Sequence, residues 1–364
     1  MNEAAPAQRV EKSRRPFLVG RLKEIRSTKI NLVVLYYPNS EEFVMTCKTL
    51  RDRRFKTGAK RVPGINSVTL ILTVSVVCVL LVTLSLAHPS SGIVVDHRGE
   101  IFFSDLSRGL LKIDAHGKVT TIGQEGGHWL ALDETGSFSQ VSFEKSKHWP
   151  RWFKRRTPVN VRPALITDGG SPLVVGLDGN IYYVCDDERM IPGGLQIAQL
   201  SPSGKEKLFN PSLRQLSKEL GGIKGLALGP DGSLYFTYPK AVLTITMKGE
   251  ITTLANPVVV KDCNLNVSPN EAPFLRGLAV DSHGVAYVAA TGCGCVVKIT
   301  PDGKVATALK AEKPWAPSGV ALHGEDIYVL EHIDPTSEND QSWPPRVRKL
   351  GRSGKVTTLM ESAP

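Results

Sequence analysis

Two catalytic motifs are missing from this sequence of 364 residues, which contains neither Gly-x-Ser-x-Gly nor His-Glu-x-x-His. The first motif positions the serine nucleophile of many hydrolases, and the second binds the zinc ion of many metalloproteases. The sequence therefore predicts neither of these mechanisms.

A basic surface is also missing from most of the chain. Of the formal net charge of +10, residues 1–67 carry +9, so the remaining residues are almost neutral. A nucleic-acid-binding domain is expected to carry its basic excess on one face of the fold. We therefore predict no nucleic-acid partner, and we expect residues 1–67 to be a basic tail with little fixed structure.

Residues 68–87 lack charge, glycine and proline. Twenty apolar residues in a helix match the hydrocarbon core of a bilayer, which is about 30 Å thick. Basic residues lie before this segment, so the positive-inside rule predicts a cytoplasmic N-terminus and an exported C-terminal part. A signal peptide cleaved near Ala87, which would give a secreted or periplasmic protein, is the open alternative, and the length of the segment favours the retained anchor.

A repeated pattern fills residues 88–364. Residues 277–290 contain two short apolar runs joined by Asp-Ser-His-Gly, a turn in which an aspartate oxygen and a glycine can close a hairpin. A second pair of runs follows at residues 296–309. Copies of the first half occur at residues 92–103, 129–136, 173–183, 225–236 and 319–329. Copies spaced by about 35 to 55 residues predict an all-β fold, a six-bladed β-propeller of four-stranded blades.

These repeats resemble the NHL-repeat family. They are more loosely similar to the gluconolactonase-like and strictosidine-synthase-like propellers. The resemblance covers residues 92–360, and it implies the fold more specifically than the function, because propellers include hydrolases, lyases and binding modules. We therefore predict a module that binds a small molecule or a protein, with a lactonase-like hydrolase or a lyase as the alternative.

The gluconolactonase-like resemblance implies a divalent cation such as Ca²⁺ in the channel, held partly by an Asn from an Asn-Gly pair at the start of a first strand. Here the corresponding positions are Lys224, Arg276 and Ser318, each followed by glycine. Because this asparagine is missing, we assign no residue as a metal ligand. A divalent cation remains the cofactor that the enzyme alternative implies.

The candidate binding site follows from the propeller topology. Residues that precede first strands and residues that follow second strands are expected to meet at one mouth of the channel. These positions carry carboxylates, imidazoles and cations, as a ligand site would. The predicted site residues are Asp105, His128, Asp187, Arg276, Glu331 and His332. The repeated aspartates, such as Asp96 and Asp281, are expected to close turns at the opposite end.

Cysteine is scarce, with six residues in the chain, of which four fall in the predicted exported part. An oxidising compartment permits disulfides. Cys293 and Cys295 lie in one loop of the fifth predicted blade, and Cys263 lies in the segment that leads into that blade. We predict a disulfide from Cys263 to one of the other two. A zinc site is disfavoured because Cys-x-Cys lacks the usual spacer and a second pair.

Overall fold

The computed structural model describes residues 90–123, 127–134, 164–168, 171–186, 195–209, 222–261, 263, 272–333 and 343–362, with Leu213, Leu216, Leu220 and the backbone of residues 31–35, 44–48 and 157–159. The chain divides into two compact units, Met1–Leu84 and Ser85–Pro364. Asp187 and the apolar segment 68–87 lie outside the described residues. Within the described part, no helix is long and apolar enough to cross a membrane.

The described residues of the first unit form an antiparallel strand pair, which the sequence analysis did not anticipate. Strand β1 (Asn31–Leu35) pairs with β2 (Val44–Lys48), with Val33 opposite Thr46. Each strand contains β-branched residues, which favour extended pairing.

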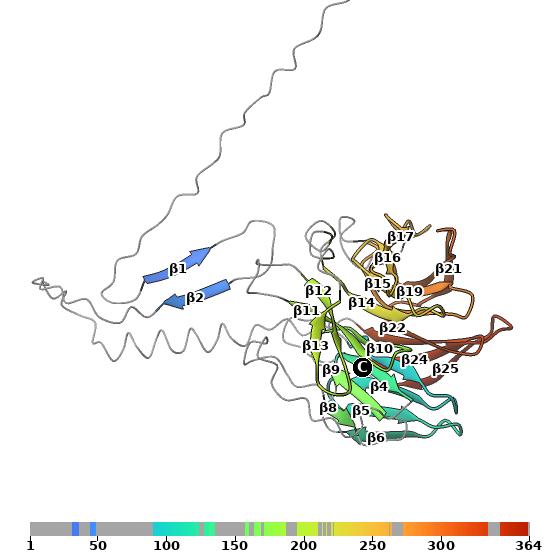
Figure 1. The fold of residues 1–364 in the computed structure, drawn as a ribbon. Helices are drawn as coiled ribbons and strands as arrows, with labels where there is room; N and C mark the ends of the chain where they lie inside the picture. Colours follow the sequence, from blue (N-terminus) through green and yellow to red (C-terminus); the bar gives the residue numbers. More distant parts are fainter. Residues whose placement is uncertain are drawn as a thin grey trace, which may run out of the picture. The chain divides into compact units, whose positions relative to one another are not determined.

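The second unit consists of antiparallel sheets built from consecutive strands (Figure 1). The first sheet is β3 (Ile93–Val95), β4 (Ile101–Asp105), β5 (Gly109–Ile113) and β6 (Val119–Gly123). The next is β7 (Trp129–Asp133), β9 (Ala164–Asp168) and β8 (Thr157–Val159), in that order across the sheet. It is followed by β10 (Leu173–Val175), β11 (Ile181–Asp186), β12 (Leu195–Leu200) and β13 (Glu206–Leu208).

In the remaining three sheets the strands lie side by side in the order of the sequence. One is β14 (Gly225–Leu228), β15 (Leu234–Thr237), β16 (Val242–Ile245) and β17 (Ile251–Ala255). The next is β18 (Leu275–Val280), β19 (Ala286–Ala290), β20 (Cys295–Ile299) and β21 (Val305–Lys310), with the 3-10 turn η1 (Thr291–Cys293). The last is β22 (Trp315–His323), β23 (Asp326–Ile333), β24 (Pro345–Leu350) and β25 (Val356–Glu361).

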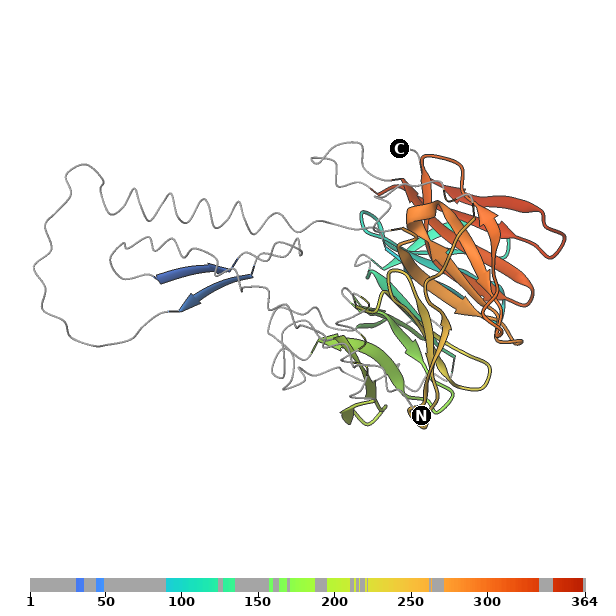
Figure 2. The ribbon, with the colours of Figure 1, turned by 90° about the horizontal axis from the view of Figure 1, so that it is seen from above.

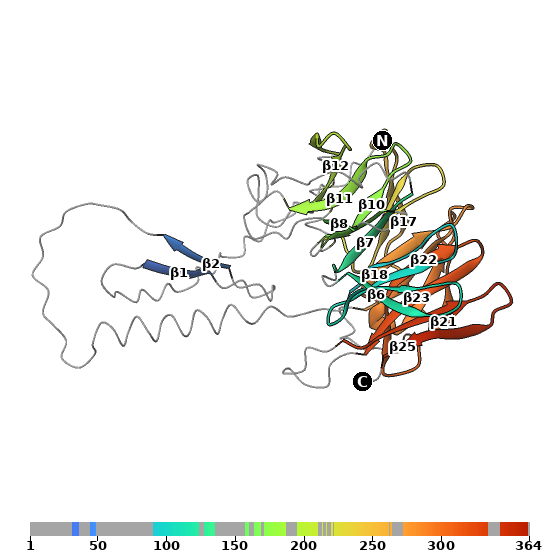
Figure 3. The ribbon, with the colours of Figure 1, turned by 90° about the horizontal axis from the view of Figure 1, so that it is seen from below.

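The first strand of each sheet lies on the inside of the unit. Strands β3, β7, β10, β14, β18 and β22 contact one another in this order, and β22 contacts β3, so the ring is closed. Figure 3 shows β7, β10, β18 and β22 between outer strands such as β12 and β25. The unit is therefore an all-β propeller with four-stranded blades. Five such blades are confirmed, whereas the β7–β9–β8 sheet has three strands among the described residues.

Glycines in the inner strands allow neighbouring blades to approach closely. A Cβ atom on Gly319 would lie 2.5 Å from the carbonyl oxygen of Ser91, and one on Gly277 would lie 2.9 Å from Cα of Gly319. A Cβ atom at either position would therefore fit only if the backbone of the neighbouring blade moved away. The repeated glycine of the sequence pattern is thus required by the backbone of the next blade.

Apolar side chains fill the spaces between the blades. Tyr182 of β11 and Phe236 of β15 belong to one buried cluster, and Phe103 of β4 shares another with Leu330 of β23. The second cluster joins the first sheet to the last, which lie side by side in Figure 2. Because no described strand of one sheet pairs with the other sheet, apolar packing and a few hydrogen bonds close the ring in the part of the chain that the structure describes.

Candidate functional site

The inner strands begin at one end of the ring, which we call the proximal end. Each second strand runs antiparallel to the first and finishes at this same end, as shown by the pairing of Ile93 with Phe103. Several buried polar side chains collect here. They are Ser90, Ser91, Ser104, Asp105, Asp168, Arg276, Ser318 and His332, all of them buried.

His332 is the most deeply buried imidazole of this group, with 1% of its surface exposed. Its Nδ1 lies 3.0 Å from Oγ of Ser318, and that hydroxyl lies 2.6 Å from the carbonyl oxygen of Ser90. A carbonyl oxygen can only accept, so the serine hydrogen points to Ser90 and Nδ1 of His332 donates to Ser318. Nε2 then carries a lone pair. In the described part of the protein Nε2 is buried without a hydrogen-bond partner.

Three other predicted site residues lie within electrostatic range of His332. Burial is the main cause that lowers the pKa of His332, to about 3, and the positive charge of Arg276 adds to this effect. Asp105 opposes the lowering, and His128 contributes to it. These residues come from β4, β18, β23 and the segment before β7. The imidazole of His332 is therefore neutral at physiological pH, and it can accept a hydrogen bond but is a weak base.

Asp105 also organises the turn between β4 and β5. Its Oδ1 accepts hydrogen bonds from the backbone and the hydroxyl of Ser107, and its Oδ2 lies 2.5 Å from Nε of Arg108. Burial alone would raise the pKa of Asp105, but the hydrogen bonds from Ser107 and Arg108 outweigh it, so the pKa is below its usual value. The carboxylate of Asp105 stays ionised and already has donors.

Glu331 does not face His332. Adjacent residues of a strand point to opposite faces of a sheet, and Glu331 and His332 both lie inside β23. Oε2 of Glu331 accepts hydrogen bonds from Nε of Arg346 at 2.7 Å and from Nε of Arg348 at 2.8 Å. Arg348 also donates to the carbonyl oxygen of Lys310 in the preceding blade. The guanidinium of Arg346 lies 4.3 Å from the ring centre of Trp315.

The expected strand boundaries were wrong in the last two blades. We predicted that Arg276 and Ser318 precede their inner strands and that Glu331 and His332 follow a second strand. In the structure β18 begins at Leu275, and β22 and β23 pair as far as Trp315 opposite Ile333. These longer strands contain all four residues. The predicted boundary lay at the repeated glycine, whereas the pairing continues past Gly319 to Trp315.

Sequence reasoning missed four polar residues of the proximal end, which are Ser90, Ser91, Ser104 and Asp168. Ser90 donates to the carbonyl oxygen of His128 at 3.0 Å and accepts from the backbone of Gly92 at 3.1 Å. Asp168, at the end of β9, accepts from the backbone of Ser171. The Thr-Asp pair that ends at Asp168 has the same form as Ser-Asp at the end of β4, and this similarity was the available signal.

The cysteines and possible metal ligands can be placed as well. Cys263 and Cys293 form a disulfide with a Cα–Cα distance of 4.7 Å, and Cys295 is a buried thiol outside it. Among the described residues, no three His, Cys, Asp or Glu side chains are grouped so that they could hold a metal ion. The metal-dependent enzyme alternative stays a prediction.

Comparisons with known proteins give no family for this protein. No family model matches it, and no curated protein matches it. Solved structures do align. A virginiamycin B lyase from Staphylococcus aureus is 15% identical with a TM-score of 0.42, over 75% of this chain and 85% of that one. XC5397 of Xanthomonas campestris, a gluconolactonase, is 16% identical with a TM-score of 0.45, over 67% of this chain and 83% of that one. Our assignment of the propeller rests on strand order and the closed ring of inner strands.

Proposed function

We propose that residues 88–364 form a ligand-binding module whose site is the polar cluster at the proximal end. The observation that supports this is the buried Nε2 of His332, which has no partner among the described residues. A buried acceptor without a partner costs about 1–3 kcal/mol. A site that keeps such an atom is expected to supply it with a donor from a bound molecule.

The chemistry of the site favours a small polar ligand that donates a hydrogen bond to Nε2. The hydroxyls of Ser91 and Ser104 are buried at the same end, and in the described region they also have no hydrogen-bond partner. The positive charge of Arg276 is near enough to add to the lowering of the pKa of His332, of which burial is the main cause. An N–H or O–H group of the ligand would donate to Nε2, and acceptor atoms of the ligand would accept from the hydroxyls of Ser91 and Ser104.

The same proposal includes three features beyond the described architecture. The β7–β9–β8 sheet would be the sixth blade, because its inner strand completes the ring between β3 and β10. The repeats would be NHL-like in form. Residues 68–87 would hold the module at a membrane, with residues 1–67 in the cytoplasm and the propeller outside, because the basic residues precede that segment.

A thermal-shift screen of the full-length protein with polyols, amides and amino acids tests the binding site. A ligand of this site should raise the Tm of the wild-type protein. His332→Asn should lose that shift, because the shorter amide can still donate to Ser318 but places no acceptor where Nε2 lies. The proposal would be contradicted if no screened compound raised the Tm of the wild-type protein more than that of His332→Asn.

A further inference from the structure

A second candidate site lies on the last blade at the end opposite to the proximal end, and it does not depend on the proposed function. It is an open groove of about 610 Å³ between the β22–β23 turn and the β24–β25 turn. Its lining includes Lys349, Arg352, Ser353 and Lys355, with Asp326 on one wall. The groove is formed around the turn Gly351 to Lys355, which we call the Gly351 turn.

The Gly351 turn belongs to a type that recurs throughout the propeller. In each such turn the first residue donates its N–H to the carbonyl oxygen of the fifth, and the fourth donates to the carbonyl oxygen of the first. Besides the Gly351 turn, turns of this type begin at Asp96, Asp114, Gly176, Ser201, Gly229, Thr246, Asp281 and Thr300. This backbone arrangement leaves the N–H of the fifth residue without a backbone acceptor.

In seven of the eight other turns of this type among the described residues, a side-chain oxygen accepts that N–H. In the turn at Asp114, Oδ1 accepts the N–H groups of His116 and Lys118, each at 2.9 Å. In the turn at Ser201, Oγ accepts the N–H of Lys205 at 3.1 Å. The oxygens of Asp96, Thr246 and Asp281 do the same from the first position. Those of Asp178 and Asp231 do so from the third position. In the turn at Thr300, the carboxylate of Asp302 at the third position accepts from the hydroxyl of Thr300 and pairs with the ammonium of Lys304.

In the Gly351 turn neither of these positions supplies the oxygen. The first residue has no side chain, and the third is Ser353, whose hydroxyl does not accept the N–H of Lys355. The N–H groups of Ser353 and Lys355 have no hydrogen-bond acceptor in the described part of the protein. A Cβ on Gly351 would meet nothing closer than Oδ1 of Asp326 at 3.6 Å and the carbonyl oxygen of Lys355 at 3.7 Å. There is therefore space for an oxygen beside the first position.

The charges around this space favour an anion. Lys349 lies 2.5 Å from Asp326, so these two charges offset each other. Arg352 pairs with Glu325 at 2.8 Å, but both side chains are more than half exposed, and an exposed pair of this kind is weak and can exchange partners. Lys355 is exposed and has no ion-pair partner in the described residues. Backbone N–H groups beside cations are a recurring way to bind anions.

We propose that the Gly351 turn binds a carboxylate supplied by a partner protein, either an acidic side chain or the terminal carboxylate of the partner. A carboxylate is favoured over a phosphate because, in the turn that begins at Asp114, the carboxylate of Asp114 accepts from the N–H groups at the same third and fifth positions. The bound carboxylate would accept from the N–H groups of Ser353 and Lys355 and lie beside the ammonium of Lys355. The rest of the groove would hold the residues that flank it.

The test uses the full-length protein with ¹⁵N-labelled lysine, in which the amide signal of Lys355 is followed by NMR at constant ionic strength. The signal is identified by its loss in Lys355→Met. Titration with acetate should shift it to saturation. Gly351→Ser should weaken this binding about tenfold, the loss that corresponds to one charge-assisted hydrogen bond. Its Oγ would accept the N–H of Lys355, as Ser201 does for Lys205 in a turn that also has Ser-Gly-Lys at its last three positions.

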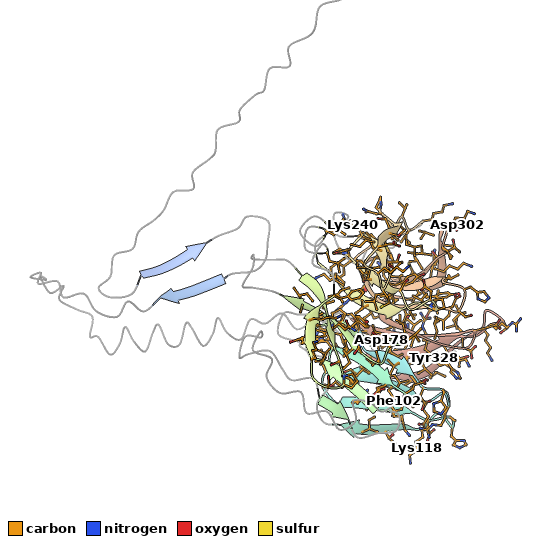
Figure 4. The ribbon with its side chains drawn as sticks, viewed as in Figure 1. Phe102, Lys118, Asp178, Lys240, Asp302 and Tyr328 are labelled. Atoms are coloured by element: carbon orange, nitrogen blue, oxygen red, sulfur yellow. A yellow bond between two sulfur atoms is a disulfide. The ribbon has the colours of Figure 1, made fainter. Side chains whose placement is uncertain are left out.

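Two matched controls separate the missing oxygen from other effects. Gly351→Ala adds the same Cβ without the oxygen and should bind acetate as the wild type does. Lys118→Met removes the lysine at the same position of the Asp114 turn, whose side chain lies at the edge of the propeller in Figure 4, and it should change nothing. No shift of Lys355 with acetate, or equal binding by Gly351→Ser and the wild type, would overturn the site.

The source of the carboxylate is tested by two further titrations. A short peptide with blocked ends and one central glutamate should bind at least about tenfold more tightly than acetate, and its glutamine counterpart should not bind. If the peptide bound no more tightly than acetate, the proposal that a partner protein supplies the carboxylate would be overturned. If inorganic phosphate bound more tightly than acetate, the assignment of the ligand as a carboxylate would be overturned.

Discussion

The hydroxyl oxygen of Ser318 lies 2.6 Å from the carbonyl oxygen of Ser90, which is 228 positions earlier in the sequence. The same hydroxyl contacts Nδ1 of His332, and Oγ of Ser90 donates to the carbonyl oxygen of His128. These hydrogen bonds connect the last blade, the start of the first blade and the β7–β9–β8 sheet. They supply polar links at the place where the ring is closed without strand exchange.

Ser318→Ala should therefore destabilise the propeller. The change leaves Nδ1 of His332 buried without an acceptor, at a cost of about 1–3 kcal/mol in the free energy of unfolding. Urea denaturation measures this cost. Ser203→Ala is the control, because Ser203 is exposed and its side chain bonds, among the described residues, only to the hydroxyl of Ser201. Its effect should stay within about 0.5 kcal/mol. Equal effects of the two substitutions would show that Ser318 has no role in closure.

The buried imidazole of His332 should make stability depend on pH in acid. Its pKa is lowered from 6.5 to about 3 in the folded state, mainly by burial. Between these values the unfolded state binds a proton that the folded protein does not, so the free energy of unfolding falls as the pH is lowered from 6.5 toward 3. The slope from this group is about 1.4 kcal/mol per pH unit, and it vanishes above pH 6.5.

His332→Asn removes this titration. Urea denaturation between pH 4 and pH 7 should show a smaller slope for this variant than for the wild type. His116→Asn, a change at an exposed turn position, should leave the slope unaltered. A His332→Asn protein with the wild-type slope would mean that other groups cause the dependence.

The disulfide between Cys263 and Cys293 closes a loop with a sequence separation of 30 residues. A cross-link of this span restricts the unfolded state and is expected to add about 3–4 kcal/mol to the free energy of unfolding. Dithiothreitol should lower the stability of the wild type by that amount and should have no effect on Cys263→Ser. Cys295→Ala, which keeps the disulfide, should remain sensitive to the reductant.

Thiol labelling gives an independent check on the cysteines. Cys263 should not react before reduction. Burial raises the pKa of Cys295 to about 11, so this thiol should also react slowly in the folded protein. Rapid labelling of Cys263 in the unreduced protein would contradict the disulfide.

The orientation of the protein in a membrane is predicted by the charges around residues 68–87. A reporter that is active only outside the cytoplasm, fused after Pro364, should be active, because basic residues precede the apolar segment. Replacing Arg51, Arg53 and Arg54 with glutamine should reduce that activity, since it removes part of the positive cluster. Activity of a cytoplasmic reporter at the same position would reverse the orientation.

The sequence predicted those parts of the fold that depend on local interactions. The turn of Asp96, with its N–H contacts to Arg98 and Glu100, follows from an Asx turn and a glycine. The glycines in the inner strands also marked the repeats. The order of the β7–β9–β8 sheet was not predicted, because the pattern of residues 129–136 indicates a second strand directly after its turn, whereas β7 pairs with the more distant β9.

The site was predicted less well than the fold. Topology alone was enough to place Asp105, Arg276 and His332 at one end of the ring. Glu331 also lies near this end of β23, opposite Pro317, but it alternates with His332, and its carboxylate accepts from Arg346 and Arg348. A repeat pattern that weakens at the end of a strand cannot show how far tertiary contacts extend the pairing.

Glu331→Gln provides the last prediction, and it distinguishes the expected role of this residue from the observed one. As a residue of the binding site, Glu331 could be changed without loss of stability. In the structure it is fully buried with Arg346 and Arg348, whose side chains are 7% and 8% exposed.

Removing one partner of a buried ion pair leaves the opposite charges without compensation, so Glu331→Gln should cost about 3–5 kcal/mol in the free energy of unfolding. Glu325→Gln, which breaks the exposed pair with Arg352, should cost less than about 1 kcal/mol. Adding Arg348→Met to Glu331→Gln should recover part of the loss, because it removes one of the two uncompensated cations. If Glu331→Gln kept wild-type stability, the buried cluster would not support the fold, and a role for Glu331 at the proximal end would have to be considered again.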